Sequence, residues 1–201
     1  MAPVLLLYIS LALPRGSGLS GAAYTSAIAE AAAIWAAHGV MIRDASLALP
    51  TLTDTILVRV VVRHRPATSG STQWRGPLGA MRFDGSGAPL AEITLYLPDL
   101  IEMIERANLP GSGGEPWPTI LRERAVGRAV GRVLAHELGH YLLRSRTHAP
   151  FGLMRAVQNT AELVAAERDT FVLSPQDAAH WAALSSGPPP ALDGDCDGGG
   201  R

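Results

Sequence analysis

The segment Val133–Leu143 carries the pattern His-Glu-x-x-His inside a run of apolar residues with helical spacing. On an α-helix, residues four apart lie on the same face, so the imidazoles of His136 and His140 can bind one metal ion. Glu137 lies about 100° further round the helix, close enough to hold a water on that ion without being a ligand. This spacing indicates a Zn²⁺ site with Glu137 as general base, which is the arrangement of a zinc hydrolase.

Two histidines with this spacing also occur by chance on exposed helix faces. Here the surrounding residues favour a helix that is anchored in a core, because apolar side chains recur at helical spacing at Leu134, Leu138 and Leu142. Gly139 leaves room for another segment to approach the helix closely, at some cost in helix propensity. The context therefore favours a metal site over a pair of surface histidines.

A catalytic zinc needs a third protein ligand and one open coordination position for water. His148 is the nearest candidate, eight residues after His140. It can reach the metal only if the helix stops soon after the motif and the chain turns beneath the ion, and a proline and a glycine downstream favour a loop there. Glu162, on the next predicted helix, is the alternative third ligand, and Glu167 is a less favoured one.

The stretch HELGHYLLRSRTHAPFGLM, from His136 to Met154, resembles the active-site segment of the metzincin zinc peptidases. That family has the HExxH helix, a turn, a third histidine and then a methionine in a tight turn beneath the metal. The resemblance implies that His136, His140 and His148 bind Zn²⁺, that Glu137 is the general base and that Met154 is the turn methionine. It also implies a zincin-like fold and an endopeptidase that hydrolyses a peptide or protein substrate.

The segment departs from the usual metzincin spacing at two positions. Leu143 stands where the family has glycine, Arg146 stands where it has the third histidine, and His148 follows two residues later. This longer spacing, followed by a Gly-Leu-Met-Arg run, resembles small bacterial zincin-like proteins. Upstream, the segment 78–83 resembles the edge strand above the zincin cleft, which predicts that an extended peptide can add to this strand by backbone hydrogen bonds.

The rest of the chain predicts one α+β domain over residues 1–186, with a mixed twisted sheet packed on an N-terminal helix and on the long active-site helix. Apolar and β-branched runs predict strands at 4–9, 40–43, 55–64, 78–83 and 91–97. Helical patterns cover 19–38, 99–107 and 119–143, and two further helices at 160–172 and 175–184 close the domain. Residues 187–201 are rich in Gly, Pro and Asp and are predicted to form a disordered tail.

The composition excludes several other kinds of protein. A hydrophobic fraction of 47% and a charged fraction of 17% are typical of a globular chain, and the net charge of −1 gives no reason to expect nucleic acid or a membrane as partner. The single cysteine, Cys196, excludes an intrachain disulfide and thiolate zinc sites. The apolar segment Val4–Leu13 has no Lys or Arg ahead of it, which favours a buried strand over a secretion signal and leaves the compartment open.

Three functions follow from the sequence. The leading one is a zinc-dependent endopeptidase of metzincin-like architecture, with His148 as third ligand. The second is an enzyme of gluzincin type, with Glu162 as third ligand. The third is a non-catalytic zinc-binding protein with a zincin fold, and Glu137 argues against it because a purely structural site does not need a carboxylate beside its ligands.

Overall fold

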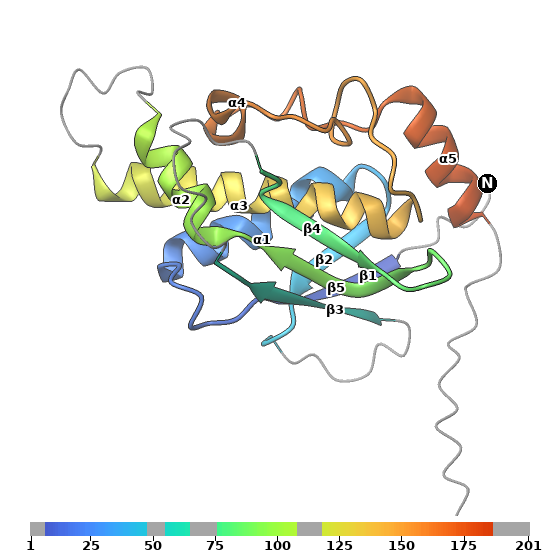
Figure 1. Ribbon diagram of the computed structural model, residues 1–201, viewed down its shortest axis with the longest axis horizontal. Coiled ribbons are helices and arrows are strands. Elements are labelled where there is room, and N and C mark those ends of the chain that lie inside the picture. Colours follow the sequence, from blue (N-terminus) through green and yellow to red (C-terminus); the bar gives the residue numbers. More distant parts are fainter. Residues whose placement is uncertain (1–6, 48–54, 65–75, 108–117, 187–201) are drawn as a thin grey trace, which may run out of the picture.

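A sheet of five strands organises the part of the chain that the computed structural model describes, residues 7–47, 55–64, 76–107 and 118–186 (Figure 1). Its strands lie in the order β2-β1-β3-β5-β4. They are β1 (Leu7–Ala12), β2 (Val40–Asp44), β3 (Thr55–Val62), β4 (Gly79–Phe83) and β5 (Pro89–Leu95). The first three pairings are parallel and only β4 runs antiparallel to its neighbour β5, so the predicted mixed sheet is confirmed.

Five helices accompany the sheet in the described residues, and the predicted α+β class is confirmed. They are α1 (Gly21–Ala36), α2 (Leu97–Arg106), α3 (Thr119–Leu142), α4 (Thr160–Val164) and α5 (Pro175–Ser185). No helix in these residues is both long and apolar enough to cross a membrane. The predicted tail at 187–201 and the first residues of the predicted N-terminal strand lie outside the described residues.

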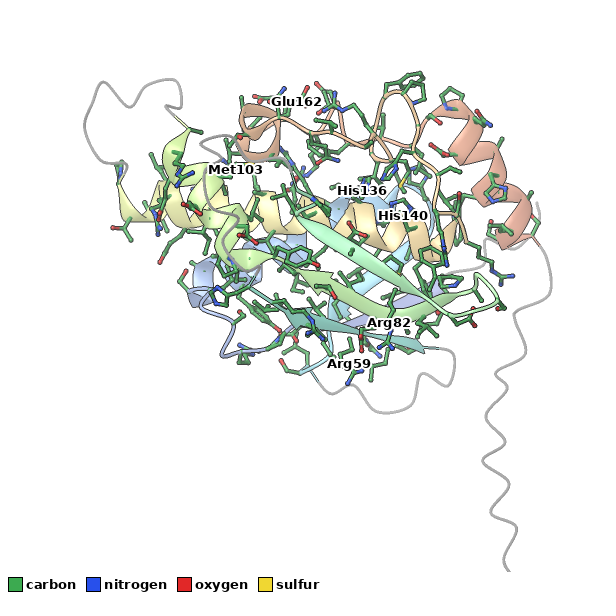
Figure 2. The ribbon with its side chains drawn as sticks, viewed as in Figure 1. Arg59, Arg82, Met103, His136, His140 and Glu162 are labelled. Atoms are coloured by element: carbon green, nitrogen blue, oxygen red, sulfur yellow. The ribbon has the colours of Figure 1, made fainter. Side chains whose placement is uncertain are left out.

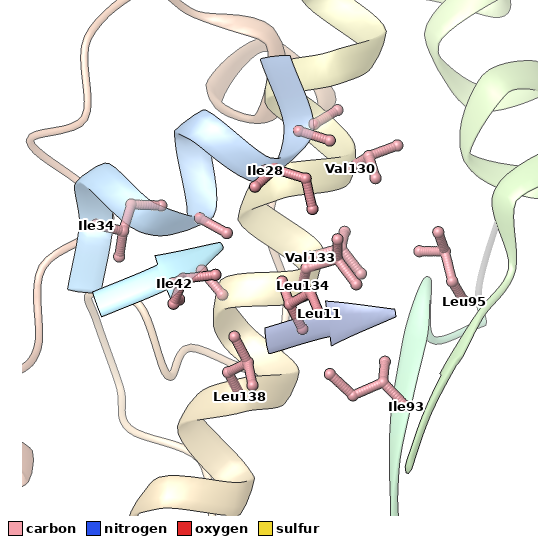
Figure 3. Packing of buried hydrophobic residues seen from close by; sticks show 14 of the residues in the cluster. Leu11, Ile28, Ile34, Ile42, Ile93, Leu95, Val130, Val133, Leu134 and Leu138 are labelled. Atoms are coloured by element: carbon pink, nitrogen blue, oxygen red, sulfur yellow. The ribbon is translucent and has the colours of Figure 1, made fainter. Parts of the chain in front are cut away.

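The hydrophobic core lies between one face of the sheet and the two helices α1 and α3 (Figure 3). Strand residues alternate between the two faces of a sheet, and here the alternate positions that face the helices are apolar and buried. They include Ile9 and Leu11 of β1, Ile42 of β2 and Ile93 of β5. The motif helix α3 supplies Leu134 and Leu138 to the same core, as its apolar spacing predicted.

Two glycines of α3 allow it to pack directly on α1. A Cβ atom at Gly131 would lie 2.6 Å from the backbone oxygen of Ala27, and one at Gly127 would lie 2.7 Å from that of Ala23. Because no side chain fits at these distances, glycine is required for the two backbones to come so close. This contact fixes α3 relative to the sheet, and therefore fixes the histidines that α3 carries.

The buried side chain of Arg132 links α3, on which it lies, to α1 and to the C-terminal segment 160–173. Its Nε donates to Glu30 Oε1 on α1 at 2.9 Å, and Arg132 and Glu30 are 0% and 3% exposed. The same guanidinium donates to the backbone oxygens of Glu162 and Glu167 and lies over the ring of Phe171, 4.4 Å from its centroid. A guanidinium with this many partners can remain charged inside a core.

The predicted helix at 160–172 is wrong in its length, because α4 ends at Val164. The reason lies in the carbonyl groups that a longer helix would use. The Arg132 guanidinium donates hydrogen bonds to the carbonyl oxygens of Glu162 and Glu167, and Arg128 Nε donates to the carbonyl oxygen of Val164 at 2.9 Å. Bonds from a distant helix thus replace the helical hydrogen bonds of this segment.

Replacing Arg132 by methionine, which fills a similar volume, is expected to destabilise the fold by about 3–5 kcal/mol, since Glu30 then stays buried with one half-exposed partner, Arg168. The matched control is Arg59→Met, because Arg59 pairs with Glu92 while its own side chain is 68% exposed. That change should cost no more than about 1 kcal/mol. Urea denaturation measures both, and equal small losses would contradict this role of Arg132.

Candidate metal centre

Three histidines meet at the C-terminal half of α3. One ring nitrogen from each of His136, His140 and His148 lies within 4.8 Å of the other two. The ring centroids are 4.8 Å apart for the first two residues, and His148 lies 5.3 Å from His136 and 4.9 Å from His140. The structure therefore brings the three predicted metal ligands together, and Figure 2 shows the first two on α3 beside the sheet.

A tight break after α3 turns the chain back so that His148 can reach the other two histidines. Arg144 adopts φ 49°, in the left-handed region, directly after the cap residue Leu143. The Arg144 N–H donates to Tyr141 O at 3.3 Å and the Ser145 N–H donates to His140 O at 3.2 Å, which is the Schellman pattern of helix ends. Glycine usually occupies this left-handed position, so Arg144 holds backbone strain at the point where the loop leaves the helix.

The loop that follows places Met154 directly beneath the motif. Met154 is 1% exposed, and a Cβ atom at Gly139 would lie only 2.2 Å from its Sδ. The loop closes through a hydrogen bond from the Ala149 N–H to Met154 O at 2.9 Å, and it joins the C-terminal segment through one from the Leu153 N–H to Val172 O at 2.7 Å. The close approach predicted at Gly139 is confirmed, and the approaching residue is the predicted turn methionine.

The hydrogen bonds of His136 and His140 orient both rings toward a common point. His136 Nδ1 lies 2.7 Å from Leu153 O, and His140 Nδ1 lies 2.7 Å from Ser145 O. Since a carbonyl only accepts, each Nδ1 carries the proton and each neutral ring keeps its lone pair on Nε2. The two Nε2 atoms face one another at 3.2 Å, so two acceptors meet with no proton between them.

This arrangement fits a metal ion held by the histidines. Two nitrogens bound to tetrahedral Zn²⁺ at about 2.0–2.1 Å lie about 3.3 Å apart, close to the separation of the two Nε2 atoms. Burial lowers the pKa of His136 to about 4 and also lowers that of His140, so both rings are neutral at pH 7. Metal ligands must be unprotonated, and a carbonyl on the second ring nitrogen is the usual support of a ligating histidine.

Glu137 is buried between α3 and the edge strand β4. It is 5% exposed, and its side chain packs against Gly79, where a Cβ atom would lie 2.8 Å from Glu137 Oε1. Burial raises the pKa of this carboxyl to about 7, and a hydrogen bond from the backbone N–H of Met81 opposes the rise. A carboxyl with a pKa near neutrality can both accept and return a proton, as general acid–base chemistry requires.

A cleft runs along the open side of β4 and contains the histidines. Its walls are β4 with the residues before it, part of α2, the motif face of α3 and the segment 155–160. Among the described residues, β4 pairs with β5 on one side only and is the last strand of the sheet, so the predicted edge strand beside the cleft is confirmed. In an antiparallel pair the backbone N–H and C=O groups of successive residues point alternately toward and away from the neighbouring strand. The Leu78 carbonyl points toward β5, because it accepts from the Tyr96 N–H, so the backbone groups of Gly79 and Met81 point away from β5.

The alternative third ligands lie apart from the histidine cluster. Glu162 forms an ion pair with Arg155, and Glu167 is exposed. Among the described residues, the cluster of possible metal ligands contains His136, His140 and His148 and neither glutamate. The geometry thus favours His148 over Glu162.

Several groups that shape the site carried no signal in the sequence. The carbonyls of Leu153 and Ser145 orient the rings, but any residue has a carbonyl. Trp35 on α1 donates its Nε1–H to the backbone oxygen of Ala135 at 3.0 Å, which links α1 directly to the motif helix α3. Asp99 and Arg155 line the cleft, and only the fold brings them to it.

Comparisons of the chain with family models, with curated proteins and with solved structures gave no match.

Replacing Glu137 by glutamine is expected to change how the stability of the metal-free protein depends on pH. Between pH 4.5 and about 7 the unfolded chain has lost the Glu137 proton while the folded protein keeps it, so stability falls as the pH rises through this window. Glutamine does not titrate, so the variant does not lose stability over this range. The free energy of unfolding of the variant minus that of wild type should therefore increase by roughly 3 kcal/mol from pH 4 to pH 8. Denaturation in the presence of a chelator tests this, and a constant difference between the two proteins would contradict it.

Proposed function

We propose that this protein is a zinc-dependent peptidase with a zincin-like metallopeptidase domain over residues 1–186. The observation that carries the proposal is the convergence of three imidazoles beside a buried carboxylate, in a cleft that an unpaired strand edge borders. Three histidines leave one position of a tetrahedral Zn²⁺ open, as catalytic sites require. Bound there, Zn²⁺ would supply a Lewis acid that lowers the pKa of water and polarises a carbonyl.

The residues of the chain account for the proton transfers of peptide hydrolysis. Glu137 takes a proton from the attacking water as its oxygen bonds to the scissile carbonyl carbon. It then gives that proton to the leaving amine as the C–N bond breaks, so that the carboxylate is regenerated. The Met81 N–H donates a hydrogen bond to the carboxylate and holds it in place for both steps.

The edge strand supports a peptide as the substrate. The backbone groups of Gly79 that face away from β5 can form hydrogen bonds with an extended chain, which then becomes an additional strand of the sheet. Such pairing uses main-chain atoms and fixes no side chain. It also holds the peptide beside Glu137, whose carboxyl packs against Gly79.

Metal binding tests the ligand set. We expect one tightly bound Zn²⁺ per wild-type chain, and a loss of affinity of at least about 100-fold in His148→Ala. Glu162→Gln is the control and should bind zinc as wild type does, since Glu162 pairs with Arg155. Competition with a chromophoric chelator measures each affinity. Unchanged binding by His148→Ala, with a loss in Glu162→Gln, would instead support the gluzincin-type site.

Cleavage of a fluorogenic peptide library tests the catalytic role of Glu137. The variant Glu137→Gln should keep its zinc and lose at least about 100-fold in kcat/KM, because it lacks the general base. Zinc content is measured on the same samples. A zinc-loaded wild-type protein that cleaves no member of the library would favour the non-catalytic zinc-binding alternative, and full activity in the variant would exclude Glu137 as the base.

A further inference from the structure

Three arginines among the described residues lie over the face of an aromatic ring, with 4.4–4.6 Å between the guanidinium carbon and the ring centroid. The pairs are Arg15 over Tyr24, Arg132 over Phe171 and Arg146 over Phe83. Stacking of this kind uses the flat face of the guanidinium and leaves the N–H donors around its edge free to bind carboxylates or carbonyls. The partners of those edge donors therefore distinguish the three arginines.

Two of the stacked arginines have their edge donors bound by other groups of the chain. Arg132 donates to Glu30 and to two backbone carbonyls, and Arg15 donates to Asp44 Oδ2 at 3.0 Å. Arg15 makes this bond although its side chain is 66% exposed, so exposure alone does not leave a stacked arginine without a carboxylate. Arg146 is exposed as well, and within the described residues its side chain makes no hydrogen bond or ion pair.

Arg146 also differs from the other arginines of the cleft. Four described arginines line the cleft, and three of them are paired with carboxylates of the chain. These ion pairs are Arg82–Glu92, Arg106–Glu102 and Arg155–Glu162. The charge of Arg146 has no such partner, so Arg146 offers the cleft a cation that a ligand can reach and neutralise.

Contacts between α3 and β4 place Arg146 on a definite side of the reacting groups. Glu137 of α3 packs against Gly79 and accepts a hydrogen bond from the Met81 N–H. Arg146, which follows the end of α3, lies over Phe83 at the last position of β4. Arg146 therefore lies beyond Glu137, toward the C-terminal end of β4. A peptide that extends the sheet antiparallel to β4, the more stable pairing, then has residues on the amino side of the cleaved bond next to Arg146.

The ring of Phe83 prepares Arg146 to bind a carboxylate. Stacking restricts the rotamers of the long side chain, so less conformational freedom is lost when a ligand binds. Water hydrates the edge donors in the free protein, which is why the fold tolerates them without a protein partner. A carboxylate can accept two parallel N–H bonds from the guanidinium edge, and bidentate pairs of this kind add geometric specificity to the attraction of opposite charges.

We propose that Arg146 is a specificity-determining residue of the cleft and binds the side-chain carboxylate of an aspartate or glutamate on the amino side of the cleaved bond. This proposal rests on the proposed peptidase function for the cleaved bond, while the recognition itself is a binding property. Main-chain pairing with β4 does not distinguish one side chain from another. Arg146 would thus supply the selection that the edge strand lacks.

Binding is measured without cleavage on Glu137→Gln protein in the presence of zinc. Two labelled peptides of otherwise neutral sequence, one with a central glutamate and one with glutamine in its place, are titrated by fluorescence anisotropy. We expect on the order of five-fold tighter binding of the glutamate peptide, as a partly exposed bidentate ion pair provides.

Three variants in the same background identify the residue that selects the carboxylate. Arg146→Gln should abolish the preference, and Arg146→Glu should reverse it through repulsion of like charges. Because Arg146 is exposed, both changes leave the core intact. Arg82→Gln is the matched control and should retain the preference, since it removes the same charge from the same cleft but from an arginine that already pairs with Glu92.

The outcomes separate this proposal from the proposed function. Equal binding of the two peptides, binding of neither, a preference for glutamate that persists in either Arg146 variant, or an equal loss in Arg82→Gln would overturn the role of Arg146. Loss of the preference in Arg146→Gln but not in Arg82→Gln supports it, even if wild-type protein cleaves neither peptide, in which case the peptidase function fails alone. Where wild type cleaves the glutamate peptide, mass spectrometry should find glutamate on the N-terminal product, and glutamate on the C-terminal product would contradict the assigned side.

Discussion

The hydrogen bonds from two histidine rings to backbone carbonyls determine what this site can do. Leu153 and Ser145 each accept from an Nδ1 atom at 2.7 Å, so the unprotonated nitrogens of His136 and His140 are turned toward one another. Both carbonyls belong to the segment that follows α3, and that segment is held by the contact of Met154 with Gly139 and by the link to Val172. The packing of one loop beneath one helix therefore sets the orientation of these two imidazole rings.

The site also concentrates features that reduce stability. Arg144 is the one non-glycine residue with a positive φ among those described, Glu137 is buried beside an edge strand, and two buried polar atoms of the cleft have no partner. Strain and unsatisfied groups of this kind persist where function requires them and other interactions compensate. Here the compensation comes from the closely packed pair α1 and α3 and from the buried Arg132–Glu30 ion pair behind the site.

The sequence predicted the elements whose patterns are local, and it missed the features that depend on distant contacts. Helical spacing around His136 and the β-branched run of β3 identified their elements directly. The sequence left the choice of a third ligand open between His148 and Glu162, because the turn that brings His148 to the other histidines uses Arg144, where no glycine marked a left-handed residue. The helix at 160–172 was overestimated because Arg132, far away in sequence, binds its carbonyls.

A zinc-bound crystal structure with anomalous diffraction at the zinc edge would show whether the three histidines hold the metal. We predict one Zn²⁺ bound to the Nε2 atoms of His136 and His140 and to the imidazole of His148, with the fourth position open to the cleft on the side of Glu137. A zinc ion without His148 in its coordination, or one whose fourth position is filled by a protein side chain, would contradict it.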